Sequence, residues 1–71
     1  MTYLLKRSVS LSGHRTSVAL EAEFWDILIQ TAAPRPLAIL IAEIDANRAP
    51  ERPLASALRL AALKAAQEKF S

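Results

Sequence analysis

The chain has 71 residues, of which 52% are apolar, and it contains no cysteine. This length excludes a multidomain enzyme, and a domain of this size buries only about 60% of the surface that its unfolded chain exposes. Because neither a disulfide nor a thiolate-bound metal is available to stabilise so small a core, we expect a second subunit to do so. The formal net charge of +2 permits a polyanionic partner without requiring one.

The sequence offers no membrane anchor. No apolar run approaches the roughly 18 to 20 residues that cross a bilayer. Residues 1–12 also lack the apolar central region of a signal peptide. We therefore expect a cytoplasmic protein that does not contact a membrane.

Positive charge is concentrated in the N-terminal quarter of the chain. Residues 1–20 contain Lys6, Arg7 and Arg15 and no acidic residue, whereas residues 21–33 contain acidic residues and no basic one. Bases without neighbouring acids are typical of an anion-binding surface, and the alternative is an ordinary solvated surface. The N-terminal quarter is therefore the candidate binding surface.

Residues 5–20 have the alternating pattern of a β-strand. Val9 and Leu11, and then Val18 and Leu20, are apolar at a period of two, with serines among the residues beside them. Residues 6–11 also resemble residues 15–20, and the Gly13 between them is the only glycine in the chain. Because glycine adopts positive φ without a steric cost, this segment is either a hairpin or one longer ribbon with a bulge.

Three helical segments follow the β segment. The helical period begins after Leu20, where acidic residues favour a helix N-terminus, and it predicts helices at 22–33, 36–47 and 53–70. Prolines separate these helices. The sequence thus predicts a mainly α fold with a short N-terminal β segment, in a single domain over residues 1–71.

The helix at 36–47 is apolar nearly all round, since its run from Leu37 to Ala42 contains only apolar residues. A helix of this kind is buried on every side, and a monomer of this size has too little protein to surround it. The sequence therefore predicts a homodimer.

The chain lacks the side chains that catalysis needs. It has one histidine and no cysteine, so converging nucleophiles, bases or metal ligands are missing. A single glycine excludes a glycine-rich phosphate loop, and Glu21 and Glu23 stand two apart on a helix and do not face each other. We expect no enzymatic activity, no cofactor and no metal.

Strand geometry divides the β segment into two faces. Thr16, Val18 and Leu20 face inward, and the residues between them face solvent. A two-stranded ribbon is narrow enough to enter the DNA major groove, and since one chain supplies one such strand, the ribbon predicts a dimer. The solvent-facing residues are Arg15, Ser17 and Ala19, with Lys6, Ser8 and Ser10 at the corresponding positions of the first copy.

The order of strand, helix, proline break and helix resembles the ribbon-helix-helix superfamily, which includes the methionine and Arc-type repressors. Residues 6–21, which read KRSVSLSGHRTSVALE, are similar to the opening KRSV…GHRTSV-LE of one bacterial family of this superfamily. Further similarities are Glu23-Phe24-Trp25 to E-FW, residues 40–45 to LI-EID and residues 54–60 to L-SALRL. The resemblance covers about residues 6–63.

The resemblance implies a ribbon-helix-helix fold with a third C-terminal helix, an intertwined homodimer, and binding of double-stranded DNA by a bacterial transcription regulator. The side chains expected to face the bases are Arg15, Ser17 and Ala19. Those expected to meet phosphates are Lys6, Arg7, His14 and Arg35. The residues expected in the dimer core are Val18, Leu20, Trp25, Leu28, Leu37, Leu40, Ile41 and Ile44.

Several positions depart from this pattern or allow more than one role. Related proteins often hold a phosphate at the start of the second helix through a Gly-x-Ser/Thr turn, whereas this turn reads Pro34-Arg35-Pro36, so Arg35 has to supply the contact. His14 binds a phosphate, bonds to the backbone or is simply exposed. If residues 6–11 fold back as an extra strand in each chain, a dimer sheet of four strands is too wide for the groove.

The alternative function is a protein-interaction module, either antitoxin-like or an assembly adaptor, that uses the same dimer without binding DNA. Its protein partner would bind the apolar helix at 53–70. The feature that distinguishes this function is exposed apolar surface at Leu60, Leu63 and Phe70.

Overall fold

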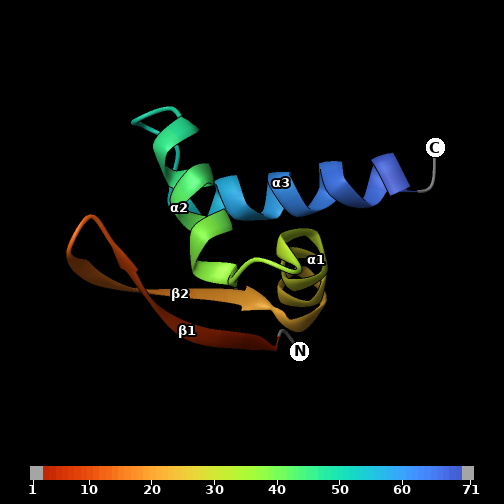
Figure 1. Ribbon diagram of the computed structural model, residues 1–71. Helices are drawn as coiled ribbons and strands as arrows, with labels where there is room; N and C mark the ends of the chain where they lie inside the picture. The colour runs from red at the N-terminus through yellow and green to blue at the C-terminus, as the bar shows by residue number, and fades with distance from the viewer. Residues whose placement is uncertain (1–2, 70–71) are drawn as a thin grey trace.

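The computed structural model describes residues 3–69, which form a β-hairpin followed by three helices (Figure 1). The strands are β1 (Leu4–Leu11) and β2 (His14–Glu21), and the helices are α1 (Ala22–Ala32), α2 (Leu37–Asn47) and α3 (Leu54–Lys69). The hairpin lies along one side of the helices, and its tip extends beyond them (Figure 1). This is the mainly α fold with an N-terminal β segment that the sequence predicts.

The helix boundaries follow the prolines. Pro36 is the N-cap of α2, so this helix begins one residue later than predicted, and α3 begins at Leu54, directly after a proline. Helix α1 ends at Ala32, with Ala33 as its C-cap. Phe70, the predicted end of α3, lies outside the described residues.

The hairpin closes through a two-residue turn at Ser12 and Gly13. Both residues have positive φ, 51° and 81°, as in the type I′ turn that suits the right-handed twist of paired strands. A β-carbon at Gly13 would meet no atom within 4 Å, so only the backbone conformation favours glycine there. Of the two arrangements that the sequence allows, the structure has the hairpin.

Both strands of the ribbon come from the same chain. Strand β1 pairs antiparallel with β2, from Leu4 opposite Glu21 to Leu11 opposite His14. The prediction that one chain supplies one strand, so that a two-stranded ribbon requires a dimer, is therefore wrong. The physical reason is the tight turn, which lets the two copies of the repeated sequence pair with each other.

One hydrophobic core holds the hairpin against the helices. Trp25 is only 1% exposed, and its indole Nε1 donates a hydrogen bond to the backbone oxygen of Leu5 at 2.7 Å. The guanidinium of Arg7 lies 5.4 Å from the centre of the same ring. Trp25 therefore joins α1 to β1. Of the other residues predicted in the dimer core, Val18, Leu20, Leu28 and Ile41 are buried in this cluster within one chain, and Leu37, Leu40 and Ile44 pack against it half-buried.

Helix α2 is covered on one side only. Of its described residues, Ile41 alone is buried, whereas Ile39 is 46% exposed and Ala38 and Ala42 are exposed. The predicted burial on every side is thus absent within one chain, because the hairpin, α1 and α3 pack around a single face of α2. The opposite face leaves apolar side chains in contact with water.

An ion pair joins α3 to the junction between β2 and α1. The Arg59 Nε donates to the Glu21 carboxylate at 3.0 Å, and the Arg59 guanidinium also lies over the ring of Phe24. The backbone N–H of Glu21 and then the Arg59 side chain hold the pKa of the Glu21 carboxyl below its ordinary 4.5. The charged form of Glu21 is therefore the form that the fold favours.

This lowered pKa predicts how stability depends on pH. A carboxyl whose pKa is lower in the folded chain stabilises the fold above its ordinary pKa, and this contribution is lost as the pH falls through the lowered value. We expect Glu21→Gln to reduce the urea midpoint at neutral pH, with the difference from the parent chain disappearing in acid. A difference that stays constant down to low pH would contradict this account.

Candidate nucleic-acid interface

The outer face of the hairpin gathers the polar residues of both strands. The register places Lys6 opposite Ala19, Ser8 opposite Ser17 and Ser10 opposite Arg15, and opposed residues of an antiparallel pair share one face. All of these side chains are exposed except Ala19, which is half-buried. The opposite face carries Val9, Val18 and Leu20, which are buried against the helices. We call the face made of Lys6, Ser8, Ser10, Arg15, Ser17 and Ala19 the outer face.

The outer face is positive. It carries Lys6 and Arg15, and no acidic residue stands between positions 6 and 19. Glu21, at the end of β2, is paired with Arg59 of α3. Since four residue positions separate the two bases along the ribbon, at about 3.4 Å each they are spread over about 14 Å of its length.

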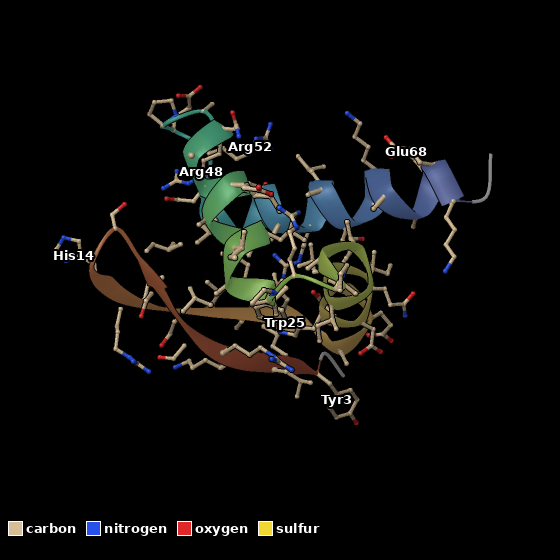
Figure 2. All side chains as sticks on the ribbon, in the orientation of Figure 1. Tyr3, His14, Trp25, Arg48, Arg52 and Glu68 are labelled. Carbon is tan, nitrogen blue, oxygen red and sulfur yellow. The ribbon has the colours of Figure 1, made fainter. Side chains whose placement is uncertain are left out.

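Two further predicted contact residues lie off the outer face. His14 is exposed at the tip of the hairpin, opposite Leu11 (Figure 2). Arg7 stands opposite Val18, on the side of the sheet that faces the helices, and its guanidinium lies over Trp25. The structure therefore brings Lys6 together with Arg15, Ser17 and Ala19, places His14 at one end of the ribbon, and does not bring Arg7 to this face.

Arg35 is engaged elsewhere. Its Nη1 donates to the Glu43 carboxylate at 2.8 Å, and this hydrogen bond, followed by the attraction of the two charges, raises the pKa of Arg35. Both side chains are about half exposed. Any phosphate that binds Arg35 in this conformation has to compete with its own carboxylate partner.

Comparison with known protein families decides the identity of the fold. The family model described as a ribbon-helix-helix domain matches residues 4–66. The chain belongs to the ribbon-helix-helix domain family. No curated protein and no solved structure matches it.

Ribbon-helix-helix domains typically form dimers and bind DNA, as transcription regulators or antitoxins, and are typically not enzymes. The resemblance seen in the sequence is thereby confirmed for family and fold. In this ribbon-helix-helix domain, the described residues 3–69 contain no cluster of three potential metal ligands.

No single helix within residues 3–69 is long and apolar enough to cross a membrane. Helices α1 and α2 reach the length and apolar composition of a membrane-spanning segment only when they are counted together, and the chain bends by 99° between them.

The sequence pattern left some residues of this ribbon-helix-helix domain out of the candidate site. Ser8 and Ser10 belong to the outer face, and their parity with Lys6 is the signal that finds them. Glu43 was not expected as the partner of Arg35, because the two residues are eight positions apart and the first of them precedes the helix. No local pattern of the sequence identifies such a pair.

Proposed function

We propose that this ribbon-helix-helix domain is a homodimeric, sequence-specific DNA-binding protein that regulates transcription in the bacterial cytoplasm. The observation that carries the proposal is the outer face of the hairpin, on which Lys6, Arg15 and three serines lie together without an acidic residue. The protein acts by binding and needs neither a catalytic group nor a cofactor.

The hairpin has the dimensions that the major groove requires. Two paired strands are about 5 Å apart, whereas the groove is about 12 Å wide, so one hairpin fits with its outer face toward the bases. Within the groove, Arg15 donates to the acceptors of guanine, Ser17 exchanges hydrogen bonds with a base edge, and Ala19 contacts a thymine methyl group. Lys6 and, at the tip, His14 bind phosphates and fix the position of the ribbon.

The pairing of residues 6–11 with β2 in the same chain limits how two chains can form a dimer that still fits the groove. Since β1 already pairs with β2, joining the strands of two chains edge to edge would produce a sheet of four strands, which is wider than the groove accepts. A dimer formed through the exposed face of α2 leaves each hairpin as a separate two-stranded ribbon. We therefore assign dimerisation to α2 and DNA contact to the hairpin.

The proposal is tested by fluorescence anisotropy of the protein with a random-sequence DNA duplex, titrated from low to physiological salt. We expect the logarithm of the association constant to fall linearly with the logarithm of the salt concentration, by about 0.9 for each phosphate contact. Selection from a random library should then yield a preferred site. Absence of binding at the lowest salt would exclude the outer face as a DNA surface.

A protein-interaction module remains the second candidate function, because one observation favours it. Leu60 and Leu63 of α3 are 47% and 49% exposed, and neighbouring apolar side chains on one helix are typical of a protein contact. Phe70, the third residue considered for this role, lies outside the described residues. A chain that dimerises but binds no DNA would favour this function.

A further inference from the structure

The exposed face of α2 has an apolar centre between two opposite charges, Arg35 just before the helix and Glu43 within it. Ile39 is 46% exposed, and Glu43 follows it one helical turn later on the same side of the helix. Arg35 stands four residues before Ile39, and its side chain runs along the helix to reach the Glu43 carboxylate at 2.8 Å. The ion pair therefore spans the part of α2 that contains Ile39.

This order of residues is self-complementary. In a two-fold symmetric contact, the same patch of both subunits meets itself. If two α2 helices cross antiparallel at Ile39, the arginine four residues before the centre faces the glutamate four residues after it on the other helix. A parallel crossing would instead bring Arg35 against Arg35 of the partner subunit and Glu43 against Glu43 of the partner subunit.

We propose that Arg35 and Glu43 select a second copy of this chain as the partner of α2, each Arg35 exchanging its own Glu43 for Glu43 of the partner subunit. The inference rests on the proposed homodimer and adds its contact, its direction and its selectivity. In the dimer, Arg35 binds a carboxylate across the interface and is not a phosphate contact.

The charged and the apolar side chains have different roles in this interface. The exchange replaces the ion pair within each subunit by an equivalent pair between subunits, so the number of ion pairs stays the same. Covering Ile39 and the neighbouring Ala38 and Ala42 removes apolar surface from water, and this burial drives association. The charges chiefly exclude chains whose α2 has a different charge order.

Charge reversal tests the selectivity. A chain with Arg35→Glu has two acidic ends on this face, and a chain with Glu43→Arg has two basic ends. We expect each variant alone to dimerise at least tenfold more weakly than the parent, since like charges then oppose each other. Mixed in equal amounts, the two variants should form heterodimers well above the statistical ratio of one to two to one, as measured by native mass spectrometry.

A matched control comes from the C-terminal end of α2. Arg48 and Asp45 form another 2.8 Å ion pair, which is local and does not span Ile39. Reversing Arg48 in one chain and Asp45 in the other should leave the mixture statistical. The chain that carries both Arg35→Glu and Glu43→Arg again has one acidic and one basic residue on this face, with their positions exchanged. We therefore expect it to form homodimers of about the parental strength. Circular dichroism checks that it folds.

A second measurement locates the centre of the contact. The chain has no cysteine, so Ile39→Cys introduces a single thiol, and a residue on the two-fold axis lies close enough to its symmetry mate to form a disulfide. We expect oxidation to yield a covalent dimer with Ile39→Cys and none with Ala46→Cys, which stands on the same helix far from the centre.

The outcomes separate this inference from the proposed function. A parental dimer whose reversed variants mix statistically, or whose Ile39→Cys chains do not cross-link, overturns the contact described here and leaves DNA binding by a homodimer in place. A parental chain that is monomeric at micromolar concentration overturns the homodimer itself, and the interface with it.

Discussion

Replacing Trp25 with alanine is expected to lower the free energy of unfolding by about 3–5 kcal/mol, the range for removing a large aromatic side chain from a core. Trp25 is 1% exposed, and its indole Nε1 donates a 2.7 Å hydrogen bond from α1 to the backbone oxygen of Leu5 in the hairpin. Its loss leaves a cavity between α1 and β1 and removes the donor to Leu5. For a domain of this size, that loss amounts to a large part of the total stability.

Urea unfolding followed by far-ultraviolet circular dichroism measures this effect, since the variant has no tryptophan to report fluorescence. The protein concentration must be kept constant, because the stability of a dimer depends on it. Tyr3→Ala is the matched control, since Tyr3 is 67% exposed and its removal should change the free energy of unfolding by less than about 0.5 kcal/mol. Equal effects of the two substitutions would contradict the role assigned to Trp25.

Removing both bases of the outer face should have the largest effect on DNA binding. We expect the chain with Lys6→Ala and Arg15→Ala to bind duplex DNA about tenfold to a hundredfold more weakly, with a salt slope reduced by about 0.9 for each lost phosphate contact. If Arg15 reads a guanine, its own share of the loss appears as relaxed sequence preference and not as a smaller slope.

The control for this variant removes the same amount of charge from another surface. Lys64 and Lys69 lie on the C-terminal half of α3, which extends away from the hairpin tip (Figure 1). The chain with Lys64→Ala and Lys69→Ala has the same net charge as the outer-face variant. Equal losses of affinity in the two variants would show that only the total charge matters, and the outer face would lose its assigned role.

The proposed DNA-binding surface and the proposed protein-binding surfaces lie on different elements of the structure. Figure 2 shows His14 at the tip of the hairpin, Arg48 and Arg52 near the C-terminal end of α2, and Glu68 near the C-terminal end of α3. The proposed DNA surface is the outer face, whereas the proposed contacts with proteins lie on helical surfaces. We therefore expect substitutions on α2 or α3 to change assembly without altering the residues proposed to contact DNA.

Periodic patterns in the sequence predicted the parts of this protein that depend on neighbouring residues. The alternation in residues 5–20 placed Arg15, Ser17 and Ala19 on one face, because side chains of a strand alternate regardless of what the strand pairs with. The helical period after Leu20 located the three helices to within about two residues of their ends. The motifs around these elements pointed to the family that the comparison confirms.

Contacts between distant residues were decided only by the tertiary structure. The sequence left the hairpin and the long ribbon equally open, and the pairing of β1 with β2 chose between them. Arg7 was assigned to the DNA surface by its charge, but its parity and the position of Trp25 place it toward the helices. Glu21 and Arg59 are 38 positions apart, so their ion pair depends on how α3 packs.

The sequence by itself thus determined the order of the elements and which side chains of each strand share a face, because both follow from the local period of polar and apolar side chains. Only the tertiary structure decided which strand pairs with which, which charges are already paired, and that one face of α2 is left uncovered. Those features depend on the distances between elements, and a one-dimensional pattern does not contain these distances.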